Sequence, residues 1–219
     1  AEALKVLRDS GIRQRWNDLH EIAIWAMEHG RWADAIGLLT ALLARAEQDA
    51  EPGSIDYEKE LASAHRSLGS AHLAIDGYGE AAEHLERSVS ILDILVLLDP
   101  ESRKLREDLY FTLVLLGRAR SKADDSSAAA VAALLRAVNG YESELGSRAT
   151  DGEERNRAAV ALMLLSGVYQ SQGMDEEAVE CCRRRVQLWR DAGAARSTTR
   201  HHDSQLADAS FELGRLLRE

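Results

Sequence analysis

The stretch SLGSAHLAIDGYGEAAEHLERSV, residues 67–89, decides the fold. In it an apolar residue precedes a small one at Leu68-Gly69, a short turn with Asp and Gly follows, and Ala81 begins a second apolar row. Apolar residues spaced by three and four positions share one face of a helix, as Ala81 and Leu85 do. The stretch therefore predicts two antiparallel helices that bury these faces against each other, with Gly69 opposite Ala81 where the helices cross.

The same pattern recurs along the chain. The other copies are LLGRARSKADDSSAAAVAALLRAV (115–138), LSGVYQSQGMDEEAVECCRRRV (165–186) and, more weakly, IAIWAMEHGRWADAIGLLTALL (22–43). The small residue recurs at Ala23, Gly69, Gly117, Ser166 and Gly214, at intervals of 46 to 49 residues. Because one helix pair alone leaves apolar flanks uncovered, this repetition predicts pairs that stack side by side in a solenoid.

These copies resemble the tetratricopeptide repeat family, whose unit is a pair of antiparallel helices with a small residue at their crossing. GRWADAI (30–36), DGYGEAA (76–82) and GMDEEAV (173–179) look like the family's turn and the start of its second helix. The resemblance implies an all-α fold, an α-solenoid of antiparallel helix pairs wound as a right-handed superhelix. The chain departs from the family in the swapped order of Asp76-Gly77, and its repeat of about 48 residues predicts longer helices than usual.

The sequence has no flexible linker long enough to separate domains, so we expect one domain over residues 1–219. We interpret this chain as a piece of a longer protein. Its repeats are expected at about 12–54, 55–99, 100–149 and 150–196, with a partial repeat at 197–219. The expected helices are 12–29, 32–49, 55–75, 78–98, 100–122, 126–147, 151–172, 175–192 and 200–218. Asp99 before Pro100 resembles a helix start, and Thr150 with Glu153 resembles a capping box. Ala1 to Arg8 is interpreted as the end of a preceding second helix.

Composition narrows the class of protein. Only 2 Pro and 5% aromatic residues favour an all-helical chain over a β-sandwich. The net charge of −10 disfavours nucleic acid as a partner, and no apolar stretch approaches the length of a membrane span. The two cysteines, Cys181 and Cys182, are adjacent and cannot staple distant segments, which favours a reducing, cytoplasmic location.

The sequence contains no catalytic constellation that we recognise, so we expect neither an enzyme nor a cofactor. It lacks a GxxxxGK[ST] loop, a GxSxG elbow, an HExxH pair and a GxGxxG turn. His201-His202-Asp203 has no third ligand at helical spacing, so we interpret it as a solvated helix start and expect no metal. His65 and His72 are expected to pack between helices, and Cys182 to be a core residue. For the arginines around Arg184 we expect ordinary ion pairs, with Glu180 as the partner of Arg184.

A partner is expected on the first helices of the pairs, which line the concave side of such solenoids. The residues of these helices that avoid the packing rows are predicted to bind it: Asn17, His20, Arg66, Ser70, Phe111, Val114, Arg118, Met163, Phe211 and Arg215. An apolar centre flanked by arginines suits an amphipathic or acidic peptide. The alternative is that the apolar side chains of this set are buried within the solenoid.

These observations favour a non-enzymatic scaffold that binds a protein or peptide on its concave face. A second hypothesis comes from the long repeat and the use of Arg for Lys, which resemble tetratricopeptide regions of bacterial regulatory and defence proteins. It makes the chain a sensor or autoinhibitory segment of a larger protease, nucleotidase or ATPase. A third is self-association through the terminal repeats.

Overall fold

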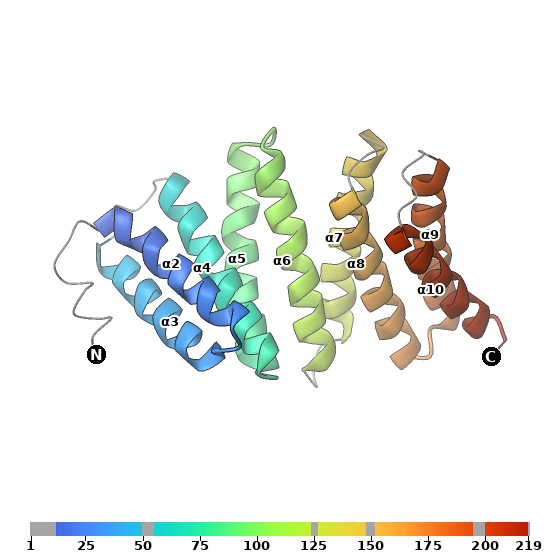
Figure 1. The fold of residues 1–219 in the computed structure, drawn as a ribbon, viewed down its shortest axis with the longest axis horizontal. Coiled ribbons are helices and arrows are strands. Elements are labelled where there is room, and N and C mark those ends of the chain that lie inside the picture. Colours follow the sequence, from blue (N-terminus) through green and yellow to red (C-terminus); the bar gives the residue numbers. More distant parts are fainter. Residues whose placement is uncertain (1–11, 50–54, 124–126, 148–151, 195–199, 219) are drawn as a thin grey trace. The chain divides into compact units, whose positions relative to one another are not determined.

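The computed structural model describes residues 12–49, 55–123, 127–147, 152–194 and 200–218, and every regular element in these ranges is an α-helix (Figure 1). The helices are α2 (Ile12–Glu28), α3 (Trp32–Asp49), α4 (Ile55–Ala74), α5 (Tyr78–Leu98), α6 (Arg103–Lys122), α7 (Ser127–Ser147), α8 (Gly152–Ser171), α9 (Asp175–Ala194) and α10 (Arg200–Leu216). The chain divides into two compact units, Ala1–Glu101 and Ser102–Glu219. The first contains α2 to α5 and the second α6 to α10, and the prediction of one domain over the whole chain stays a prediction.

Within each unit, helices that follow one another in the chain pack together (Figure 1). In the first unit α3 lies between α2 and α4, and α4 pairs with α5. In the second unit α7 packs against α6 and α8, and α9 packs against α8 and α10. The first helices of consecutive pairs also touch, α2 with α4 and α6 with α8. The predicted fold class of stacked antiparallel helix pairs is confirmed.

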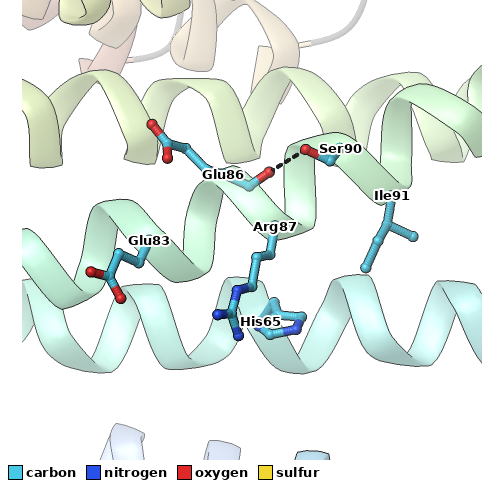
Figure 2. Close-up of a pocket in the computed structure, with 6 residues that line it drawn as sticks. All are labelled: His65, Glu83, Glu86, Arg87, Ser90 and Ile91. Carbon is cyan, nitrogen blue, oxygen red and sulfur yellow. Dashed lines mark hydrogen bonds between the residues drawn. The ribbon is translucent and has the colours of Figure 1, made fainter. Parts of the chain in front are cut away.

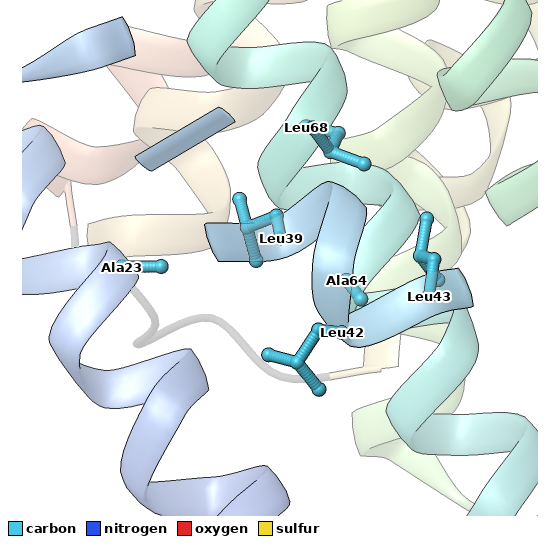
Figure 3. Close-up of a cluster of buried hydrophobic side chains, with 6 residues drawn as sticks. All are labelled: Ala23, Leu39, Leu42, Leu43, Ala64 and Leu68. Atoms are coloured by element: carbon cyan, nitrogen blue, oxygen red, sulfur yellow. The ribbon is translucent and has the colours of Figure 1, made fainter. Parts of the chain in front are cut away.

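The predicted small residues lie where the helices of a pair cross. A Cβ on Gly69 would stand 2.5 Å from Leu85 Cγ, and a Cβ on Gly117 would likewise meet the side chain of Leu134. The hydroxyl of Ser166 donates a hydrogen bond to the Ala178 carbonyl and lies 3.4 Å from Cys182 Sγ. Ala23 is buried in one cluster with Leu39, the residue of the first pair that corresponds to these partners (Figure 3). Four pairs therefore share one crossing contact.

The fifth small residue has different surroundings. A Cβ added to Gly214 would meet only the end of the Arg218 side chain, at 3.9 Å. No second helix follows α10 among the described residues, so the crossing contact predicted at Gly214 is not formed there.

Three first helices end in the same backbone turn. Gly30, Asp76 and Gly173 have φ values of 71°, 61° and 71°, in the left-handed region. The next residue in each case donates its N–H to the carbonyl five positions earlier, as in Arg31 to Ala26 at 2.8 Å and Gly77 to His72 at 2.9 Å. These are Schellman closures. The swapped Asp76-Gly77 therefore keeps the turn, because aspartate is among the residues that tolerate this conformation.

The expected helix ends are reproduced within three residues, but the start predicted at Pro100 is wrong. The N–H of Asp99 still donates to the Leu95 carbonyl and closes α5, Pro100 and Glu101 form a turn, and α6 begins at Arg103 after Ser102. Asp99 thus ends one helix instead of capping the next. Thr150 of the predicted capping box and the predicted helix over Ala1 to Arg8 lie outside the described residues. Across the described part of the chain, no helix has the length and apolar character to cross a bilayer.

Candidate functional site

In the second unit, the predicted partner-binding residues lie on the first helices α6, α8 and α10. We call this set the first-helix face; it consists of the predicted Phe111, Val114 and Arg118 on α6, Met163 on α8, and Phe211 and Arg215 on α10, to which we add Val160 on α8. Side-chain contacts tie the three helices together at this face. The Cζ atom of Arg157 lies 5.1 Å from the ring centroid of Phe111, and Arg215 Nη2 donates to Gln170 Oε1 at 2.9 Å. The first contact links α8 with α6, and the second links α10 with α8.

The apolar residues of this part of the chain differ in exposure. Met163 is 41% and Phe211 71% exposed, and Val160 is also exposed, although all three are large apolar side chains. Phe111 is half-buried, and Val114 is only 6% exposed. A partner could therefore reach Met163 and Phe211, whereas Val114 offers it almost no surface.

Positively charged side chains lie on the same first helices as these apolar residues. Arg118 and Arg215 are both exposed. Arg157, which the sequence reasoning did not single out, lies over Phe111, and Gln170 receives the hydrogen bond of Arg215. A signal for Arg157 was present, because it lies one turn before Val160 on the same helix face. The face can thus accept carboxylates beside apolar groups.

In the first unit, the structure brings two predicted residues together. His20 Nε2 lies 3.0 Å from Ser67 Oγ and bridges α2 to α4. Burial, helped by the positive charge of Arg66, lowers the pKa of His20 below 6.5. His20, Arg66 and Ser70 are all half-buried, so they offer less accessible surface than Met163 or Phe211. The side chain of Asn17 lies outside the described residues.

A second candidate is a cavity of about 520 Å³ between α4 and α5, shown in Figure 2. It is lined by His65, Glu83, Glu86, Arg87, Ser90 and Ile91. His65 Nδ1 lies 3.1 Å from His84 Nδ1, which requires that one ring donates and the other accepts. Burial, together with the charges of His84 and Arg87, lowers the pKa of His65 to about 4. A histidine with that pKa is a weak base at neutral pH, so it is poorly suited to general base catalysis.

The expected packing of the histidines is confirmed. His65 is buried, and the ring of His72 stacks on that of His84 with centroids 5.7 Å apart. The side chains of His201 and His202 lie outside the described residues. Among the side chains that the structure describes, no three His, Cys, Asp or Glu residues are grouped so that they could hold a metal ion.

Replacing His65 with asparagine is expected to make the stability of the protein less dependent on pH. The folded pKa of about 4 lies below the unfolded value near 6.5, so the unfolded chain binds the proton first as the pH falls. The contribution of a neutral His65 is therefore fully present above about pH 6.5 and is lost as the pH falls toward 4. Urea midpoints at neutral and mildly acidic pH measure this, with the exposed His29→Asn as the control. An unchanged pH dependence in His65→Asn contradicts the assignment.

The cysteines behave as core residues. Cys181 and Cys182 are both buried, as predicted for Cys182. Burial raises the pKa of Cys181 to about 11 and also raises that of Cys182. Since the thiolate is the reactive form of cysteine, neither side chain is activated at neutral pH.

The arginines of α9 join neighbouring helices. Arg184 Nη2 donates to Glu142 of α7 at 2.6 Å, and Arg185 pairs with Glu212 of α10. The prediction that Arg184 pairs with Glu180 is wrong, because Glu180 instead pairs with the exposed Arg183 at 3.5 Å. A similar pair joins α6 to α8, where Arg103 Nη2 donates to the buried Glu154 at 2.7 Å. Arg183, Arg184 and Arg185 each form an ion pair, as predicted, although two of these pairs join different helices.

Shared crossing contacts, recurring turns and first helices in mutual contact define the class of protein: a tandem array of helix pairs. Solved structures identify the fold more closely. The structure is similar to that of the nearly identical TPR-like repeats of a Podosopora anserina protein named as a kinesin light chain. The TM-score is 0.68 at 24% sequence identity, and the match covers 93% of this chain and 86% of that chain. The fold is therefore that of tetratricopeptide-like repeats.

Two further structures agree. A form of the same Podosopora anserina repeats that carries one substitution has a TM-score of 0.63 at 20% identity, over 95% of this chain and 96% of that chain. The structure of BtubC (BKLC) from P. vanneervenii has a TM-score of 0.53 at 18% identity, and the match covers 99% of this chain and 85% of that chain. No family model and no curated protein matches the sequence. At these identities the likeness shows the fold, and the repeat length of about 48 residues stays a prediction.

Proposed function

We propose that this chain is a non-enzymatic protein-interaction scaffold, and that its second unit binds a segment of a partner protein on the first-helix face. One observation carries the proposal: Met163 and Phe211 are large, apolar and exposed on first helices, and the first helices of the same unit also carry the exposed Arg118 and Arg215. The tetratricopeptide-like fold supports it, since arrays of helix pairs present extended binding surfaces.

The chemistry of the face indicates the kind of segment that it binds. Aliphatic or aromatic side chains of the partner would cover Met163 and Phe211, where burying apolar area favours binding. Carboxylates would pair with Arg118 and Arg215, and the geometry of a guanidinium suits them. The partner segment is therefore amphipathic and acidic.

The rigidity of the face contributes to affinity. Arg157 is stacked on Phe111, and Gln170 holds Arg215 while its own Nε2 donates to Ser166 Oγ at 3.2 Å. Side chains that are already ordered lose less entropy when a partner binds. We infer that the partner segment orders on a surface that changes little.

Replacing both Met163 and Phe211 with aspartate is expected to weaken binding at least about tenfold, because it adds charge to the apolar centre. The probes are phage-displayed peptides selected from a random library on the unaltered chain, and their sequences are expected to be rich in apolar and acidic residues. Binding is measured by fluorescence anisotropy. Circular dichroism and the melting temperature should change little, because both side chains are exposed.

Ile75→Asp is the matched control, since Ile75 is an exposed apolar residue of the first unit. Arg118→Glu separates the effect of charge from that of apolar contact, and it should weaken the binding of acidic peptides only. If the double variant binds the selected peptides as tightly as the unaltered chain, or if Ile75→Asp weakens them equally, the first-helix face is not the binding site.

A further inference from the structure

The outward face of α2 is exposed, although its composition is partly that of a packing surface. Ile22 is 50% and Trp25 49% exposed, and Asp18, one turn earlier on the same side of the helix, is also exposed. We call these three residues the Trp25 face. The Trp25 ring stacks only on His29 of its own helix among the ring contacts of the described residues, with centroids 4.2 Å apart.

The corresponding positions of the other first helices are almost all buried. Counted from the small residue of each repeat, they are Ala64, Leu68 and Ala71 on α4; Thr112, Leu116 and Ala119 on α6; Ala161, Leu165 and Val168 on α8; and Ala209, Leu213 and Leu216 on α10. All are buried except Leu213, which is half-buried. The Trp25 face is therefore exposed at positions that the rest of the chain uses for packing.

A preceding second helix covers this kind of face elsewhere in the chain. On α4, Leu42 and Leu43 of α3 join Ala64 and Leu68 in one buried cluster (Figure 3). On α10, Val186 and Trp189 of α9 pack with Ala209 in the same way. In both cases the cover is a helix whose apolar residues are spaced by three or four positions. The natural occupant of the Trp25 face is thus an amphipathic helix.

Charge and size specify this occupant further. Glu21 and Glu28 flank the Trp25 face and are exposed, and Asp18 lies within it, so a complementary helix carries basic residues. Where α4 has Ala71, α2 has the much larger Trp25. The occupant must therefore place a small residue opposite the indole, since two helices approach closely only where one side chain is small.

We propose that the Trp25 face is a docking site for a basic amphipathic helix of a partner protein, separate from the first-helix face of the second unit.

Two synthetic helices of equal length test the proposal with the full 219-residue chain. Both carry leucines at positions i, i+3, i+4 and i+7 and an alanine in the middle of the row; one has lysine and the other glutamate at the flanking positions. Fluorescence anisotropy of the labelled peptides gives the affinities. The lysine peptide is expected to bind at least about tenfold more tightly than the glutamate peptide.

Two variants and a control assign the binding to this surface. Trp25→Ala is expected to lower the affinity for the lysine peptide about tenfold or more, because tryptophans contribute strongly to the binding energy of such interfaces. Asp18→Lys combined with Glu21→Lys should lower this affinity by a similar factor. The double variant alters only exposed charges, so it remains informative if Trp25→Ala disturbs folding. Ile75→Ala removes an equally exposed isoleucine of the same unit and should leave the affinity unchanged.

Several results would overturn the proposal. They are a lysine peptide that does not bind, equal affinities for the lysine and glutamate peptides, and a loss of affinity in Ile75→Ala as large as that in Trp25→Ala. A mass in light scattering that rises with concentration and falls to that of one chain in Trp25→Ala would assign the face to a second copy instead. Tighter binding after removal of residues 1–10 would show that the chain's own N-terminal segment competes for it.

Discussion

Replacing Gly69 with leucine is expected to lower the free energy of unfolding by about 3 kcal/mol. A single Cβ at this position would stand 2.5 Å from Leu85 Cγ and 3.2 Å from the Ala81 carbonyl oxygen. Leu85 is fully buried and the carbonyl belongs to the backbone of α5, so neither can move aside without displacing the helix. Urea unfolding followed by circular dichroism measures the loss as a lower midpoint.

Gly37→Ala is the matched control, because Gly37 lies inside α3 and an added Cβ would meet nothing within 4 Å. It is expected to raise stability by about 0.5–1 kcal/mol, since alanine favours a helix more than glycine does. The crossing contact would be refuted by a Gly69→Leu chain that unfolds at the same urea concentration as the unaltered one.

Replacing Glu212 with leucine is expected to cost about 3 kcal/mol, because Arg185 then remains buried without its carboxylate. The Arg185 side chain is 8% exposed and pairs with Glu212 across α9 and α10. The guanidinium keeps its charge at any accessible pH, so it cannot escape the cost by losing a proton. Urea unfolding of the full chain measures the loss.

Two further variants separate burial of the charge from the ion pair itself. Arg185→Met combined with Glu212→Leu should recover most of the stability, since apolar side chains of similar size can replace a buried ion pair. Glu180→Gln breaks the exposed pair with Arg183 on the same helix and should change stability by no more than about 0.5 kcal/mol. Equal effects of Glu212→Leu and Glu180→Gln would show that burial of Arg185 does not matter.

The helix pairs could be predicted from the sequence because their contacts repeat at a regular spacing. The alanines that recur in the copies, Ala35, Ala81, Ala130 and Ala178, are all fully buried. The small residues at four crossings lie against Leu39, Leu85, Leu134 and Cys182, each of which follows one of these alanines by four positions. Each such position is constrained by the geometry of two helices at close approach. Local rows of apolar residues therefore contain enough information to specify the pair.

The binding site was less predictable, because exposure depends on helices distant in the sequence. Val114 and Met163 are both apolar and were both expected on the binding face, yet the first is buried and the second exposed. Arg184 has an acidic residue four positions earlier and pairs instead with Glu142, which is 42 positions away. Spacing within one helix cannot reveal such competition between partners. The role of the chain as a sensor segment of a larger enzyme stays a prediction.

Contacts between consecutive helices have a consequence for how this chain folds. Within each unit, every helix touches only the next helix or the next but one along the chain. Each hairpin can thus close early, without a long search through conformational space, and chains with such local contacts fold quickly. For the same reason, a whole hairpin could be gained or lost during evolution while its neighbours keep most of their contacts.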